Sequence, residues 1–184
     1  MDTGHILRKL RVPAGWVFFI MVVFFGSIRT LWPLALVIAG EAIRTAASGI
    51  IKKNEELACG GIYRFVRHPL YFGSFLIAAG FCAAFGTLPI WIYFLIFFPA
   101  TYISTIRQEE RFLAEKFPLE YNFYRRHVPA FFPLFFRRFT GCTVPVSFSI
   151  VRCFQNGELI NWLVIAATAG ALFIKTFLTS TRSI

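Results

Sequence analysis

The sequence predicts an all-α integral membrane protein with about five transmembrane helices. Three observations predict this class. Hydrophobic residues make up 57% of the 184 residues and charged residues only 15%, whereas charged residues are about a quarter of a soluble domain. The apolar residues gather into runs long enough to cross a hydrocarbon core about 30 Å thick. Lys and Arg residues concentrate on one side of these runs, as the positive-inside rule requires.

Five apolar runs are the expected spans. The first, third and fourth contain no charged residue, whereas the second contains Glu41 and Arg44. These two residues are three positions apart, so they share one helix face and we expect them to pair with each other. The fifth run is short for a membrane span. The runs cover residues 12–28, 31–51, 70–86, 88–106 and 159–174.

The distribution of charge predicts the orientation of the chain. The first run follows basic residues as in a signal peptide, but Arg29 and bulky residues occupy the place of a cleavage site, so we expect a retained span. With the N-terminus inside, the positive-inside rule accounts for the net charge of +10, and we expect no nucleic-acid partner. The outer turn at residues 86–89 is short and uncharged, so we expect the functional site at the cytoplasmic face.

The four cysteines are Cys59, Cys82, Cys142 and Cys153. Their spacing shows no paired metal-ligand pattern, and two of them flank or enter the membrane. We therefore expect neither a disulfide nor a bound metal.

Polar residues meet at the inner end of the second hairpin. His68 precedes the outer turn by about as many residues as Glu109 follows it, so an antiparallel hairpin brings them to the same membrane level. Pro69 suits the first position of a helix, which places His68 at the N-cap. The helix N-terminus with Arg67 and His68 forms a cationic subsite, and Glu109 with Glu110 an anionic one. The alternative is an ion-pair network that only solvates two helix ends.

Aromatic residues follow these acids. A helix over residues 118–126 would place Tyr121, Tyr124 and Arg125 on one face. Prolines beyond this helix turn the chain back, so the helix can close a pocket over the mouth of the hairpin. Tyrosines at a membrane interface also occur simply as an aromatic belt, and this alternative remains open.

Three motifs carry a resemblance to a known family. They are "GGIYRFVRHPLYFG", then "RQEERFLAEKF", and then tyrosines 121 and 124 with prolines 129 and 133 behind them. In this order they resemble the isoprenylcysteine carboxyl methyltransferase and phospholipid methyltransferase superfamily of integral membrane enzymes. Upstream, "GEAIRTAASGIIKKNEEL" is similar to the prokaryotic members, so the resemblance covers about residues 40–133. The chain departs from the family pattern at Ile62 and Pro118, where members commonly have proline and glycine.

The resemblance implies a methyltransferase that binds S-adenosylmethionine from the cytosol, releases S-adenosylhomocysteine and takes a lipophilic substrate from the bilayer. The location it implies is a prokaryotic cytoplasmic (inner) membrane with the N-terminus inside. Gly73 would let the cofactor approach its helix closely. The expected cofactor-binding residues are Arg67, His68, Tyr71, Gly73, Glu109 and Glu110.

Methyl transfer from a sulfonium is an in-line displacement that depends mainly on alignment and exclusion of water. A carboxylate acceptor needs no base, whereas an amine or thiol must lose a proton, for which Glu110, Tyr121 or His127 is a candidate. Arg107 or Arg125 is expected to orient an anionic acceptor. The candidate catalytic residues are therefore Arg107, Glu110, Tyr121 and Arg125.

The expected organisation is a single membrane domain over residues 1–184, with a first hairpin at 1–51 and a C-terminal loop and fifth span at 141–184. Between them lies a catalytic core at 52–140, which includes the second hairpin at 70–106 and a cytoplasmic cap at 107–140. Asn156 and Glu158 precede the fifth span on the side of the site and are candidates for its lining.

Two alternatives to this function remain. One is N-methylation of the ethanolamine head group of a phospholipid, and the other is a non-catalytic small membrane transporter or assembly factor with the same fold. The expected partners are a lipophilic substrate and membrane lipids, while the acceptor, the oligomeric state and the role of the last span are left undetermined.

Overall fold

The computed structural model describes residues 3–52, 56–134, 139–142 and 146–181. Within these ranges the chain forms α-helices and one short 3-10 helix and no strand, which confirms the all-α prediction. The α-helices are α1 (Thr3–Phe25), α2 (Leu34–Ile50), α3 (Pro69–Phe85), α4 (Leu88–Lys116), α5 (Pro118–His127), α6 (Ile150–Gln155) and α7 (Glu158–Thr181), and the 3-10 helix is η1 (Gly61–Arg64).

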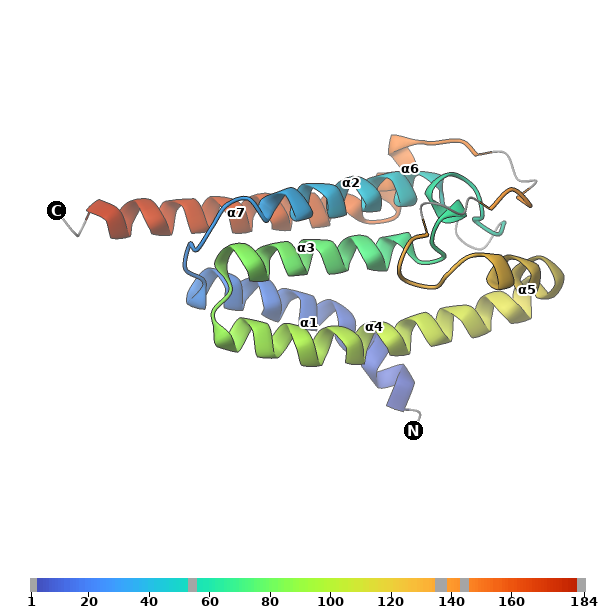
Figure 1. Cartoon of the computed structure of the whole chain (residues 1–184), viewed down its shortest axis with the longest axis horizontal. Coiled ribbons are helices and arrows are strands. Elements are labelled where there is room, and N and C mark those ends of the chain that lie inside the picture. The colour runs from blue at the N-terminus through green and yellow to red at the C-terminus, as the bar shows by residue number, and fades with distance from the viewer. Residues whose placement is uncertain (1–2, 53–55, 135–138, 143–145, 182–184) are drawn as a thin grey trace.

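Five long helices lie along the long axis of the molecule, and the short elements gather at one end (Figure 1). Helix α1 packs mainly against α4, and α2 packs mainly against α3. The helices of each predicted hairpin therefore make most of their contacts with the other hairpin. Helix α4 continues past its predicted span to Lys116, which places Glu109 and Glu110 on the helix itself.

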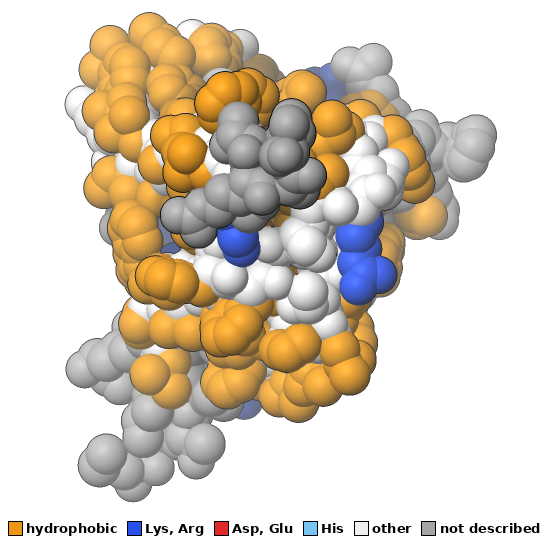
Figure 2. All heavy atoms as spheres, turned by 90° about the vertical axis from the view of Figure 1, so that its left-hand side faces the viewer, with side chains coloured by type: hydrophobic (Ala, Val, Ile, Leu, Met, Phe, Trp, Pro, Cys, Tyr) orange, Lys and Arg blue, Asp and Glu red, His pale blue; other side chains and the backbone are white. Residues whose placement is uncertain are grey.

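Among the described residues, two helical segments are long and apolar enough to cross a membrane, Leu88–Lys116 and Glu158–Leu178. The apolar segments Leu10–Phe25 and Pro69–Phe85 are shorter. Viewed from the end opposite α5, hydrophobic side chains dominate the visible described surface, with a few Lys and Arg side chains among them (Figure 2). The two long segments agree with the predicted fourth and fifth spans, and the other three spans stay a prediction.

The contact between α2 and α3 depends on glycines. A Cβ built on Gly40 would lie 2.6 Å from the backbone oxygen of Gly73, and one on Gly73 would lie 2.6 Å from the Cγ of Arg44. Small residues of this kind let two helix backbones approach closely. Gly73 therefore faces α2 and does not line the cavity described below, so the structure gives no support to its expected role in admitting a cofactor.

The expected pairing of Glu41 with Arg44 is also wrong. Arg44 makes a two-pronged ion pair with Glu158 at the start of α7, with nitrogen to oxygen distances of 2.7 and 3.2 Å. Glu41 instead accepts a hydrogen bond from the side-chain amide of Asn161 at 2.5 Å. Glu158 is 2% exposed, and a carboxylate buried to that degree requires a close cation, which Arg44 supplies.

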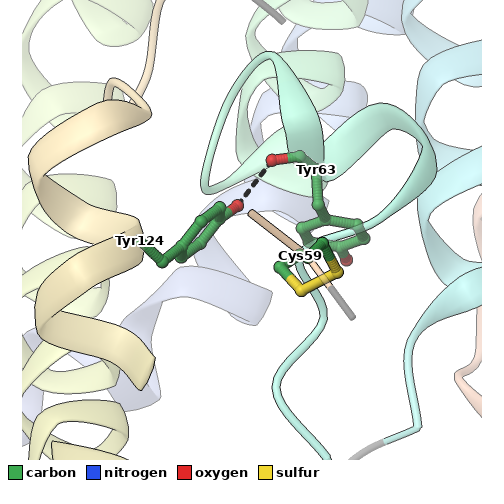
Figure 3. Close-up of a disulfide and its surroundings, with 4 residues drawn as sticks. Cys59, Tyr63 and Tyr124 are labelled. Atoms are coloured by element: carbon green, nitrogen blue, oxygen red, sulfur yellow. Dashed lines mark hydrogen bonds between the residues drawn. A yellow bond between two sulfur atoms is a disulfide. The ribbon is translucent and has the colours of Figure 1, made fainter. Parts of the chain in front are cut away.

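A disulfide joins Cys59 to Cys142, with their Cα atoms 5.6 Å apart (Figure 3). This corrects the expectation that the cysteines are unpaired. The backbone N–H of Phe139 donates to the carbonyl of Arg64, which returns residues 139–142 to the loop before α3. Residues 83 positions apart in sequence become neighbours in this way, which their spacing alone does not reveal.

Helix α7 closes the bundle on the side of α2 and α1. At its far end, the ammonium group of Lys175 donates hydrogen bonds to the carbonyl oxygens of Val23, Phe24 and Gly26 at 2.8 to 3.1 Å. These are the carbonyls that a helix leaves without partners at its C-terminus, and a cation is favourable there. The last helix is thus attached to the rest of the chain at both ends, through Glu158 and Lys175.

Candidate active site

The centre of the site is His68, which lies between two carboxylates. Its Nδ1 is 3.5 Å from Oε2 of Glu109, and its Nε2 is 3.3 Å from Oε1 of Glu110. Arg67 reaches the same Glu110 oxygen at 2.9 Å. The predicted meeting of the start of α3 with the inner half of α4 is therefore confirmed.

The local sequence fixes this arrangement. Pro69 is the first residue of α3 and His68 is its N-cap, as predicted. The backbone N–H groups of Arg67 and His68 donate to the carbonyls of Pro129 and Ala130 at 2.9 and 3.2 Å. The chain beyond α5 thus returns to hold the residues just before α3, because these N–H groups precede the helix and need partners elsewhere.

The charges within the cluster support one another. Burial alone would lower the pKa of His68, but its hydrogen bonds to Glu109 and Glu110 raise it above its usual value. Burial would raise the pKa of both carboxyls, yet the hydrogen bond from His68 holds each below its usual value. The contacts within the cluster therefore favour the protonated form of His68 and the ionised forms of both carboxyls. The separate cationic and anionic subsites expected from the sequence are in fact one connected network.

Two tyrosines of α5 cover this network. Tyr121 and Tyr124 are buried, and Arg67 donates a hydrogen bond to the hydroxyl of Tyr121 at 3.3 Å. The hydroxyl of Tyr124 donates to the carbonyl of Tyr63 at 2.6 Å, beside the disulfide (Figure 3). Burial, with the nearby Glu110 charge, raises the pKa of Tyr121 to about 12. Tyr121 therefore keeps its proton near neutral pH, which makes it a hydrogen-bond donor rather than a base.

The two arginines expected to orient an acceptor lie elsewhere. Arg107 and Arg125 are exposed, and neither lines the cavity. Residues two apart on an α-helix point about 200° apart, so a helix that turns Glu109 toward His68 turns Arg107 away. Arg125 is exposed after the buried Tyr124, although its charge is close enough to favour a lower pKa of Glu110 and Tyr121. The structure thus gives no support to their proposed role.

A cavity of about 670 Å³ opens beside the cluster. Glu110 and Gly73 are absent from its lining, whereas His68, Tyr71 and Glu109 are part of it. Asn156 and Glu158 also line it, as predicted. Aromatic side chains of α1 and α4 form a further wall, namely Trp16, Phe19, Phe94, Phe97, Phe98 and Tyr102, while α2 and α7 add polar side chains such as Ser48 and Asn161. We call the part of the cavity beside the cluster its polar end and the part lined by these aromatic residues its apolar end.

Sequence reasoning missed two residues at the polar end. Arg11 on α1 donates a hydrogen bond to the hydroxyl of Tyr71 at 3.1 Å, and no motif marks it. Tyr63 lies in the motif that begins at Gly60, and its hydroxyl is buried without a hydrogen-bond partner among the described residues. The Nε of Arg67 is likewise buried without a hydrogen-bond partner among the described residues. Buried polar groups are nearly always paired, so unpartnered ones that line a cavity indicate a place for a polar ligand.

Comparison with known proteins agrees with these motifs. Residues 43–120 match the family model described as phospholipid methyltransferase. Protein-S-isoprenylcysteine O-methyltransferase of Schizosaccharomyces pombe is 29% identical over 138 residues, which are 71% of this chain and 58% of that protein. No solved structure matches.

Two further relatives have names that refer to metal resistance. The cobalt-zinc-cadmium resistance protein CzcN of Cupriavidus metallidurans is 40% identical over 82 residues, and the nickel-cobalt-cadmium resistance protein NccN of Alcaligenes xylosoxydans xylosoxydans is 35% identical over 82. Each match covers 45% of this chain and 38% of the relative. The chain thus spans between 38% and 58% of the curated relatives it matches. Among the described residues no group of three or more His, Cys, Asp or Glu could hold a metal ion.

Proposed function

We propose a function from the premise that this chain belongs to the isoprenylcysteine carboxyl methyltransferase and phospholipid methyltransferase superfamily. The proposed function is that of an S-adenosylmethionine-dependent methyltransferase for a lipophilic or lipid-attached acceptor. One observation carries the proposal beyond family membership. The network of Arg67, His68, Glu109 and Glu110 stands at the polar end of a cavity that also has an aromatic wall from α1 and α4. A polar cofactor and an apolar acceptor can meet in such a space.

The residues present fit the cofactor. S-adenosylmethionine combines a carboxylate, an ammonium group, ribose hydroxyls and a purine ring, and when bound it supplies a methyl group on a sulfonium. The unpartnered Nε of Arg67 suits the carboxylate, and Glu109, which stays ionised, suits an ammonium or hydroxyl group. Tyr71, stacked on His68 with ring centroids 5.6 Å apart, gives an aromatic wall beside them.

Each residue then has a distinct task. His68 and Tyr71 form the binding wall, while Glu110, outside the cavity lining, holds Arg67 and His68 in place. Tyr121 covers the network and donates a hydrogen bond. Together these residues orient the reactants and keep water out, and these two effects provide most of the acceleration of an in-line displacement.

Several features support a location in the membrane. Helices α4 and α7 are long and apolar, and side chains such as Leu95, Ile96 and Leu163 are exposed on them. The apolar end of the cavity borders α1, α4 and α7, so an acceptor would enter from the bilayer. The excess of Lys and Arg at the end that carries the site supports a cytoplasmic location for that end by the positive-inside rule.

The test is isothermal titration of S-adenosylhomocysteine into detergent-solubilised protein. We expect stoichiometric binding by the wild type and a loss of at least tenfold in Glu109→Gln, because a charge-assisted hydrogen bond is removed. Glu115→Gln is the matched control, since Glu115 is an exposed acid on the same helix. Absence of binding by folded wild-type protein would refute the proposal. Equal loss in both variants would refute the site.

The acceptor is then identified with a labelled methyl donor. The substrates to offer are prenylated cysteines, phosphatidylethanolamine and small lipophilic thiols. Methylation of phosphatidylethanolamine alone would favour the phospholipid alternative, whereas cofactor binding without transfer to any class would favour a non-catalytic role.

A further inference from the structure

One basic side chain in the cavity differs from the others. Arg44 pairs with Glu158 at 2.7 Å, Lys52 with Glu56 at 2.7 Å, and Arg67 with Glu110 at 2.9 Å. Arg11 also lines the cavity, but among the described residues no carboxylate lies within 4.0 Å of it. Its guanidinium donates to the hydroxyl of Tyr71 at 3.1 Å and lies over the tyrosine ring, 5.4 Å from its centroid. A guanidinium has five donors, so most of this group remains available to a ligand.

Arg11 lies where the polar and apolar ends of the cavity meet. Through Tyr71 it is linked to His68, whose ring stacks on the tyrosine. On the other side, Ala14 and Gly15 lie one turn further along α1 and share its face. A Cβ built on Gly15 meets no atom within 4 Å, so open space lies beside Gly15, one turn from Arg11 on the cavity lining.

From these contacts we infer that Arg11 binds the anionic oxygen group of an amphiphilic acceptor, whose apolar chain extends along Gly15 between α1 and α4. The inference rests on the proposed function and adds the substrate class, an amphiphile with a carboxylate or phosphate group next to its chain. It assigns to Arg11 the role first expected of Arg107 and Arg125, which are exposed. Arg11 lies outside residues 43–120, so the family match does not mark it.

A basic residue at the start of a membrane helix often only faces the interface and its lipids. The contacts of Arg11 differ from that arrangement. Its side chain is half-buried and points to Tyr71 on α3 rather than to solvent. The arginine therefore acts inside the cavity, beside the network that would hold the cofactor.

The test compares probes that differ only in charge. Dodecanoate, dodecyl phosphate and the neutral methyl dodecanoate are titrated into the protein in a non-ionic detergent, and binding is followed by tryptophan fluorescence and calorimetry. For the wild type and for each variant, the quantity compared is the ratio of the affinity for an anionic probe to the affinity for the neutral ester. The wild type should prefer at least one anion over the ester by about tenfold or more, as expected for charge-assisted hydrogen bonds.

Variants then locate the origin of this preference. Arg11→Gln should reduce the ratio to about one, and Arg11→Lys should retain part of it. Arg29→Gln, at an exposed arginine near the other end of α1, should keep the full ratio. Gly15→Phe should weaken all three probes alike, because it fills the space for the chain without changing the charge.

The possible outcomes test the inference about Arg11 separately from the proposed methyltransferase function. A wild type without preference for either anion, or an Arg11→Gln variant that keeps the preference, overturns the inference. The better anion shows whether a carboxylate or a phosphate ester is recognised. Titration of S-adenosylhomocysteine into the same samples tests the proposed function independently, since failure to bind it would leave the charge preference intact.

Discussion

The ion pair between Arg44 and Glu158 offers a test in which burial alone decides the magnitude. Glu158 is 2% exposed and Arg44 is 18% exposed, and their closest atoms are 2.7 Å apart. Arg44 also donates to the carbonyl of Leu70 at 3.2 Å and to the hydroxyl of Ser74 at 2.5 Å. Replacing Arg44 with methionine leaves a buried carboxylate without a partner, which typically costs about 3 to 5 kcal/mol.

The same chain contains a matched control. Lys52 and Glu56 are also 2.7 Å apart, but they are 35% and 34% exposed. Pairs this exposed contribute about 0 to 1 kcal/mol, so Lys52→Met should change the free energy of unfolding by no more than that. Both substitutions remove a cation at the same distance from an acid, but only Arg44→Met leaves a buried carboxylate unpaired.

The assay is unfolding of the detergent-solubilised protein, combined with a double-mutant cycle. Arg44→Met should be strongly destabilised, whereas Arg44→Met with Glu158→Leu should recover most of the loss, because no unpaired charge then remains buried. Equal losses for Arg44→Met and Lys52→Met would refute the reasoning. A double variant as unstable as the sum of the single variants would refute it as well.

Three further predictions concern the same framework. Gly73→Val should lower the free energy of unfolding by about 1 to 3 kcal/mol or more, because its Cβ would lie 2.6 Å from a backbone oxygen. Gly170→Val is the control in the same unfolding assay and should have little effect, because its Cβ would meet nothing within 4 Å. Reducing the Cys59–Cys142 disulfide, which joins residues 83 positions apart, should lower the free energy of unfolding by up to about 4.5 kcal/mol, and Cys59→Ser should abolish any effect of the reductant. Folding raises the pKa of His68, so the protonation of His68 stabilises the fold fully below about pH 6.5 and less as the pH rises through the folded pKa. In a plot of the free energy of unfolding against pH, His68→Gln should remove this decrease.

The sequence predicts those parts of the site that depend on local rules. Pro69 as the first residue of α3 follows from the lack of an N–H in proline. The short turn between α3 and α4 fixes the register of the two helices, which brings His68 to Glu109. A pair on a hairpin with a short connection is predictable because few conformations of that connection exist.

Contacts between distant segments follow no such rule. Arg44 and Glu158 are 114 positions apart, and Arg11 and Tyr71 are 60 apart. The prediction paired Arg44 with Glu41 because they were the only charged neighbours on one helix face. The three-dimensional packing instead brings a more deeply buried acid to the arginine, and a buried charge has more to gain from pairing than a partly exposed one.

The residues proposed for the two halves of the reaction also differ in their place in the sequence. His68, Tyr71 and Glu109 lie inside the segment that matches the family model, whereas Arg11 and Glu158 line the same cavity from outside it. In the proposed function, the matched segment holds the methyl donor and the flanking helices choose the acceptor. Substitution at Glu109 should therefore impair every acceptor equally, whereas substitution at Arg11 should change the ranking of acceptors. If Arg11→Gln lowered transfer to charged and neutral acceptors by the same factor, this division of labour would be wrong.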